Sequence, residues 1–237
     1  MAENLLEEGL QKLGLGGDER VLSLLTRYVE EIELFNSAYG LVKVSGRREL
    51  IVKHILDSLA PIDILRDLID RQHAGQNIPQ IADIGSGAGL PGIPLAICMH
   101  GAEFTLVERM GRRAGFLLNV IAVLGLSSVR VEESEMEKLI RPSSGAGRFD
   151  IVVFRAFKPL ESAILKNLTM LLAPGGVIAA YKGRRESIDE EMARLELLGR
   201  RGKIRREIIP VKVPFLEDER HLLVIRNFAN GQEDIFS

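Results

Sequence analysis

The chain has 237 residues, of which 46% are apolar and 27% charged, and its formal net charge is -2. This length and composition predict one globular protein with a well-filled core, and the near-neutral charge excludes a basic field that would attract nucleic acid over the whole surface. A lone cysteine, the lack of a ~20-residue apolar stretch and an acidic N-terminus exclude a disulfide framework, a membrane span and a signal peptide. We therefore expect a cytoplasmic protein that does not enter a membrane.

The first 76 residues have the pattern of amphipathic helices. Apolar residues recur there at three- and four-residue spacing, and Asp18 is placed to cap the second helix. The predicted helices cover residues 3–13, 18–36, 47–59 and 62–69. We expect this segment, 1–76, to form a helical cap or lid on a core of residues 77–237, the two making a single domain.

From Pro79 onward, short apolar strands alternate with amphipathic helices, which is typical of a parallel sheet built from βαβ units. The predicted strands are 80–84, 103–107, 128–131, 149–154, 177–181, 205–213 and 221–226, and the predicted helices are 92–99, 110–124, 158–172 and 186–198. No helix separates the last two strands, so they should pair as an antiparallel hairpin on the sheet edge. The predicted fold class is α/β, Rossmann-like.

The stretch IADIGSGAGLPG, residues 81–92, is the strongest functional signal in the chain. Asp83 ends an apolar strand, at the edge where open α/β sheets bind their ligands. Gly85, Gly87 and Gly89 then permit positive φ angles and a close approach of the backbone to a ligand. This arrangement predicts a cradle for a nucleotide-like cofactor.

Two kinds of cofactor fit this loop. Gly87, Gly89 and Gly92 match the G-x-G-x-x-G pattern of dinucleotide-binding proteins, so an NAD(P)-dependent oxidoreductase is one alternative. Glu108 follows the next strand, 19 positions after Gly89, where an acidic side chain accepts hydrogen bonds from ribose hydroxyls. Asp83 before the loop, Glu108 after it and the terminal hairpin together resemble the class I methyltransferases that use S-adenosylmethionine.

Five segments narrow that resemblance. They are VKHILDSL at 52–59, DIGSGAGLPGIPL at 83–95, FDIVVFRA at 149–156, YKG at 181–183 and ERHLLVI at 219–225. In order and spacing they resemble the bacterial small-subunit ribosomal RNA methyltransferase family called RsmG or GidB. The resemblance implies methyl transfer from S-adenosylmethionine to N7 of a guanine in the 530 loop of 16S ribosomal RNA. The expected partner is that RNA or the small ribosomal subunit, and the expected state is a monomer.

The resemblance also implies roles for individual residues. The implied cofactor-binding residues are Asp83, Gly85, Gly87, Gly89, Leu90, Glu108, Met136, Glu137 and Arg155. Arg155 at the end of the fourth strand, and His54 in a helix that closes over the pocket with Asp57 and Ser58, are implied near the methyl-transfer centre. Lys182, Arg220 and His221 match polar positions around the substrate entrance.

The expected chemistry follows from the nucleophile. Guanine N7 carries a free lone pair, so attack on a sulfonium methyl group needs no general base, and catalysis should consist of positioning and electrostatic accommodation. We expect no metal, because the histidines and the cysteine lack ligand spacing. The basic groups at Arg47 and Arg48, at Arg109, Arg112 and Arg113, and at Lys182, Arg184 and Arg185 are predicted to form a surface that contacts RNA phosphates.

Two departures from the family pattern leave a second alternative open. Gly40, Leu41 and Val42 stand where the family has N-L-T, although Asn36 is kept, and Phe154 stands where serine is common. A protein with these changes could keep the methyltransferase fold and act as an RNA-binding or ribosome assembly factor without turnover.

Overall fold

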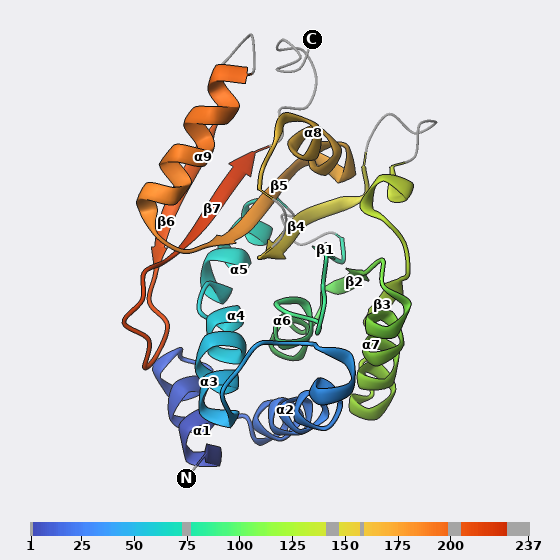
Figure 1. Cartoon of the computed structure of the whole chain (residues 1–237), viewed down its shortest axis with the longest axis vertical. Helices are drawn as coiled ribbons and strands as arrows, with labels where there is room; N and C mark the ends of the chain where they lie inside the picture. Colours follow the sequence, from blue (N-terminus) through green and yellow to red (C-terminus); the bar gives the residue numbers. More distant parts are fainter. Residues whose placement is uncertain (1, 73–76, 141–146, 157–158, 199–204, 227–237) are drawn as a thin grey trace.

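A computed structural model describes residues 2–72, 77–140, 147–156, 159–198 and 205–226. Seven strands form one sheet in the order β3-β2-β1-β4-β5-β7-β6 (Figure 1). The strands are β1 (Gln80–Ile84), β2 (Glu103–Val107), β3 (Val129–Glu132), β4 (Phe149–Arg155), β5 (Leu172–Lys182), β6 (Arg206–Val211) and β7 (Arg220–Arg226). Every predicted strand is present, and the predicted fold class is confirmed.

The direction of β7 distinguishes this sheet from the dinucleotide-binding fold. Strands β1 to β5 are mutually parallel, whereas β7 is antiparallel to both of its neighbours, β5 and β6. The predicted hairpin is therefore confirmed. Of its two strands, β6 lies at the edge of the sheet, whereas β7 lies inside the sheet between β5 and β6. The dinucleotide fold has the order 3-2-1-4-5-6 without an inserted antiparallel strand. The topology thus removes the support that the glycine spacing gave to an oxidoreductase.

Helices cover both faces of the sheet. They are α1 (Ala2–Lys12), α2 (Glu19–Tyr39), α3 (Arg47–Leu50), α4 (Asp57–Leu59), α5 (Ile62–Gln72), α6 (Gly92–Cys98), α7 (Gly111–Leu124), α8 (Ser162–Leu171) and α9 (Arg185–Leu198). The N-terminal helices share one apolar cluster with α6, α7 and one face of the sheet, while α8 and α9 pack on the other face (Figure 1). Asp18 caps α2 as predicted, accepting hydrogen bonds from the amides of Arg20 and Val21.

The predicted helix over residues 47–59 is interrupted. Residues Ile51–Leu56 form a π-helical segment between α3 and α4. At its end the amide of Asp57 donates to the carbonyl of His54, three residues back, and not to that of Lys53 as in a regular α-helix. The Lys53 carbonyl is thereby left to bind a side chain. Nothing in the apolar periodicity indicates this change, because a π-turn keeps the same face buried.

The predicted helix 158–172 is wrong at both ends. Residues 157 and 158 lie outside the described part of the chain, and α8 begins only at Ser162, because the amide of Leu160 donates to Glu191 of α9 at 2.7 Å and not to a helical carbonyl. At the other end, Leu172 already pairs with Phe149. A bulge then delays regular pairing until Val177, which is why the apolar pattern indicated a strand only from there.

Candidate functional site

The loop between β1 and α6 has the backbone conformation that its glycines predicted. The φ angles of Gly85, Gly87 and Gly89 are 72°, 58° and 93°. A Cβ atom on Gly89 would lie 2.5 Å from Ile93 Cγ1, so this glycine also leaves room for helix packing. A Cβ atom on Gly87 would meet nothing nearer than 3.9 Å, which means that Gly87 faces open space.

Asp83 connects the end of β1 to the first residue of α6, on the other side of this loop. Its side chain is fully buried, and Oδ2 accepts a hydrogen bond of 2.9 Å from the amide of Gly92, the first residue of α6. Burial raises the pKa of this carboxyl to about 7. Oδ1 has no partner among the described residues. Asp83 therefore fixes the loop to the helix start.

Glu108 joins the loop to the next strand end. Its Oε2 accepts from the amide of Gly87 at 2.9 Å, and its Oε1 accepts from the amide of Met110 at 2.8 Å. Each carboxylate oxygen can accept a further hydrogen bond. Glu108 also lines a cavity of about 450 Å³, within the size range of small-molecule sites. The remaining lone pairs suit the two hydroxyls of a ribose.

This cavity, the cofactor cavity, contains only part of the predicted cofactor set. Its lining residues are Ile84, Gly85, Val107, Glu108, Arg109, Met110, Arg113, Ser134, Glu135, Met136, Glu137 and Ala156. Four predicted residues, Gly85, Glu108, Met136 and Glu137, are among them. Asp83, Gly87, Gly89 and Leu90 support the loop without lining the cavity, and Arg155 lies in a neighbouring one.

Some lining residues could have been found from the sequence. Ser134 and Glu135 follow β3, and the carboxyl ends of parallel strands meet at one sheet edge. Ala156 carried no such signal. It has a φ angle of 50°, which is uncommon outside glycine, and it follows β4 at the boundary between the two cavities.

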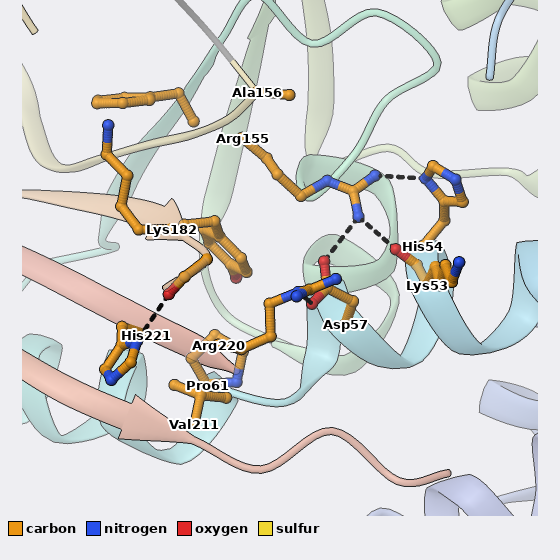
Figure 2. A pocket seen from close by; sticks show the side chains of 13 residues that line it. Lys53, His54, Asp57, Pro61, Arg155, Ala156, Lys182, Val211, Arg220 and His221 are labelled. Carbon is orange, nitrogen blue, oxygen red and sulfur yellow. Dashed lines mark hydrogen bonds and ion pairs between the residues drawn. The ribbon is translucent and has the colours of Figure 1, made fainter. Parts of the chain in front are cut away.

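The neighbouring cavity, the substrate cavity, has a volume of about 570 Å³ (Figure 2). Its lining residues are Lys53, His54, Asp57, Pro61, Phe154, Arg155, Ala156, Tyr181, Lys182, Gly183, Val211, Arg220 and His221. Predicted residues from the helical segment 47–59, from β4, from β5 and from β7 are thus brought together. Ala156 belongs to both cavities, so they meet at the end of β4.

Arg155 is held by residues of the helical segment 47–59 through three hydrogen bonds. Nη1 donates to the freed carbonyl of Lys53 and to Asp57 Oδ2, both at 2.9 Å, and Nη2 contacts His54 Nδ1 at 2.8 Å (Figure 2). Only 15% of the Arg155 side chain is exposed. The π-helical segment therefore fastens the end of β4, next to the boundary of the two cavities.

The contact with Arg155 fixes the proton of His54. A guanidinium can only donate, so Nδ1 must accept, and the proton of the neutral ring lies on Nε2. Burial, followed by the charge of Arg155, lowers the pKa of His54 to about 4. His54 is thus neutral near pH 7.

An NMR titration tests this state of His54. We expect its ring to titrate near pH 4, and the Arg155→Gln variant to raise the pKa towards 6.5 because a positive charge is removed. The unfolded chain takes up this proton first, so His54 leaves stability unchanged above about pH 6.5 and lowers it as the pH falls towards 4. A native His54 that titrates near 6.5 would contradict the effect assigned to burial and to the charge of Arg155.

The other predicted substrate residues have different surroundings. Lys182 forms a partly buried ion pair of 2.7 Å with Glu191, and His221 Nδ1 donates to the carbonyl of Gly183 at 2.7 Å. Arg184 lines a third cavity, between α9 and the residues before α8. Arg185 lines none of the three cavities and pairs with Asp189 at 3.0 Å.

The phosphate-contacting surface stays a prediction, and the structure shows which of its arginines are paired. Arg47 is paired with Glu33 at 2.5 Å, and Arg185 is paired with Asp189. Each pair lowers the net positive charge of the surface around its arginine. In the described part of the chain, Arg109 and Arg184 form no ion pair and lie beside cavities. Among the same residues, no three His, Cys, Asp or Glu side chains gather as they would around a metal ion. No described helix is long and apolar enough to cross a membrane.

Both departures from the family pattern fit the fold. Asn36 Oδ1 accepts from the amide of Val42 at 2.9 Å, so the kept asparagine holds the changed segment. Phe154 is 2% exposed and lies under Lys182, whose Nζ is 6.0 Å from the ring centroid. Neither residue blocks the cofactor cavity.

Comparisons with known proteins agree on one family. The family model described as "GidB: rRNA small subunit methyltransferase G" matches residues 21–223. Ribosomal RNA small subunit methyltransferase G of Treponema denticola is 35% identical over 249 aligned positions, which cover 95% of this chain and 94% of that protein. The protein of the same name from Stenotrophomonas maltophilia is 38% identical, covering 93% of this chain and 92% of its own.

Solved structures support the fold. The O-methyltransferase from Bacillus cereus, determined in complex with SAH, has a TM-score of 0.59 at 18% identity and covers 96% of this chain and 100% of its own. A putative O-methyltransferase from Klebsiella pneumoniae has a TM-score of 0.57 at 16% identity, and the match covers 94% of this chain and 97% of that protein. At such identities the likeness shows the shared architecture alone.

Proposed function

The chain belongs to the GidB family, the rRNA small subunit methyltransferase G proteins, and from this premise we propose that it methylates N7 of a guanine in the 530 loop of 16S ribosomal RNA. The methyl donor is S-adenosylmethionine, whose sulfonium supplies an activated methyl group when bound. The observation that supports this reaction most directly is the pair of cavities that meet at Ala156, one with an acidic ribose site and one with basic walls.

The cofactor cavity has the groups that the methyl donor requires. Glu108 would accept hydrogen bonds from the ribose hydroxyls, and Met136 with Glu137 would lie beside the adenine. Gly85 lines the same cavity with its backbone, at a φ angle of 72°. In this assignment the loop must also keep its shape around the cofactor. The residues that maintain this shape without lining the cavity are Asp83, Gly87, Gly89 and Leu90.

The substrate cavity suits an RNA base with its phosphate. Its lining carries Lys53, Arg155, Lys182 and Arg220 against one carboxylate, Asp57, so the formal charge of the lining is positive, and Lys53 and Lys182 are also paired with Glu49 and Glu191 outside it. Such a cavity attracts the backbone of a loop nucleotide, and single-stranded loops can turn a base outward. We assign Lys182, Arg220 and His221 to the entrance, and Arg184 and Arg185 to the adjoining surface.

The chain's own residues need not remove a proton in this reaction. N7 of guanine attacks with its lone pair, so the protein has to hold the base in line and tolerate its new positive charge. His54 is neutral near pH 7 and adds no second cation beside Arg155. We propose that the helical segment 1–76 serves as the lid over this site.

A labelling experiment tests the function and separates it from the assembly-factor alternative. Unmethylated small subunits and naked 16S RNA are incubated with the protein and radiolabelled S-adenosylmethionine, and the label is mapped by borohydride and aniline cleavage at N7-methylguanine. We expect label on one guanine of the 530 loop, and none on particles first methylated with unlabelled cofactor. If the protein bound the small subunits but transferred no labelled methyl group to them, the result would favour the assembly-factor function.

Two finer expectations accompany this proposal. We propose that the protein acts in the cytoplasm, where ribosomal subunits are assembled. The monomeric state stays a prediction, and light scattering of the purified protein would measure it directly.

A further inference from the structure

One carboxylate connects three distant parts of the chain in the substrate cavity. Asp57 Oδ2 accepts from Arg155 Nη1, and Oδ1 accepts from Arg220 Nε, both at 2.9 Å (Figure 2). The Asp57 side chain is 7% exposed. It therefore links the lid segment, the end of β4 and the start of β7, and each of its oxygens holds a different guanidinium.

A count of donors shows what Arg155 still offers. A guanidinium has five N–H groups. Two on Nη1 donate to Lys53 and Asp57, and one on Nη2 donates to His54. The Nε–H and the second Nη2–H have no partner among the described residues. Arg155 lines the substrate cavity, so a molecule bound there is the partner that these two groups would have.

From this arrangement we propose that Asp57 is a positioning residue: it orients Arg155 so that the two free N–H groups bind O6 of the target guanine. This inference rests on the proposed function. Guanine presents two acceptors side by side, N7 and O6, whereas adenine presents N7 and an amino donor. A fixed donor at O6 holds N7 towards the cofactor cavity and rejects adenine.

The charge of Asp57 has a second effect on the same step. As N7 attacks, positive charge moves from the sulfonium to the guanine, and Arg155 beside the base opposes this movement. The negative charge of Asp57 lies within hydrogen-bond distance of that guanidinium and offsets part of its field. Arg155 can thus donate to O6 with less electrostatic penalty at N7.

The test combines a protein variant with a change of one base atom. Asp57→Asn keeps the side-chain size and removes the charge, and 2-aminopurine keeps N7 but lacks O6. Reconstituted small subunits carry guanine or 2-aminopurine at the mapped target position. For the wild type we expect loss of O6 to lower kcat/KM roughly 30-fold, and for Asp57→Asn only about threefold, because the orientation of Arg155 is already lost.

The variant itself should lose about tenfold in kcat with guanine while its cofactor affinity and KM stay within about twofold. Asp63→Asn serves as the control, since Asp63 is 77% exposed and, among the residues that the structure describes, pairs only with Arg66 on the same helix. An equal loss on removing O6 in wild type and Asp57→Asn would overturn the proposal, because a purely structural effect lowers both rates by the same factor.

A second measurement does not depend on turnover. In ¹⁵N NMR spectra, the Nη signals of a fixed guanidinium are separate, and those of a freely rotating one merge. We expect separate Arg155 signals in the wild type and in Asp63→Asn, and merged signals in Asp57→Asn. If the wild type labels no guanine, the proposed function fails, and merged signals in the wild type would also show that Asp57 does not orient Arg155.

Discussion

Replacement of Arg155 by glutamine is expected to lower kcat for guanine methylation by on the order of 100-fold, because the base loses the group that orients it. Cofactor affinity should change by less than about threefold. Arg155 lines the substrate cavity, and it does not line the cavity that contains Glu108. The measurements are single-turnover methylation of small subunits and calorimetric titration with S-adenosylmethionine.

The stability of the same variant needs a separate measurement. Removal of Arg155 leaves Asp57 with Arg220 as its remaining charged partner and leaves the carbonyl of Lys53 without its donor, which should cost about 1–3 kcal/mol of unfolding free energy. Arg130→Gln is the matched control, because Arg130 is 44% exposed on β3 and contacts Thr105 and Glu103. Equal losses of cofactor affinity and rate in Arg155→Gln would contradict its assignment to the substrate side.

Replacement of Gly87 by valine is expected to weaken S-adenosylmethionine binding by at least about 100-fold. A β-branched residue is strained at a φ angle of 58°, and its side chain would extend into the open face of the loop. A change of the loop would also displace the Gly87 amide from Glu108, the carboxylate assigned to the ribose. Calorimetry with the cofactor measures the loss.

Gly125→Val separates backbone strain from cofactor binding. Gly125 ends α7 with a φ angle of 66°, and a Cβ atom there would meet nothing within 4 Å. Both variants should lose a similar unfolding free energy, about 1–3 kcal/mol, but Gly125→Val should bind the cofactor normally. The cradle assignment fails if the two variants lose the same affinity.

The sequence predicted the parts of the site that depend on local backbone and on strand order. Positive φ angles at Gly85, Gly87 and Gly89 follow from the lack of a side chain, and the meeting of Glu108 with that loop follows from neighbouring parallel strands. The contacts of Arg155 did not follow. They depend on a π-helical turn whose apolar face looks like that of an α-helix, and on three residues far away in sequence, Lys53, His54 and Asp57.

The residue motifs also indicated more charge at the surface than the structure leaves free. Arg47 and Arg185 were predicted to face phosphates, yet each is paired with a carboxylate of a neighbouring turn or helix. The pair of Arg47 with Glu33 joins two helices, which periodicity does not encode, whereas Arg185 and Asp189 are four residues apart on α9 and their pairing follows from helical spacing. Periodicity also does not encode the contacts of Glu191, which binds both Lys182 and the amide of Leu160 and thereby sets where α8 begins.

The position of Asp57 in the chain has a consequence for synthesis. Its partners Arg155 and Arg220 lie 98 and 163 residues further along. A nascent chain can form the lid helices and the glycine loop early, but the carboxylate obtains its second guanidinium only after β7 has left the ribosome. Contacts of such long sequence separation form late and slowly. Incomplete chains would therefore lack a finished substrate cavity even where they already bind the methyl donor.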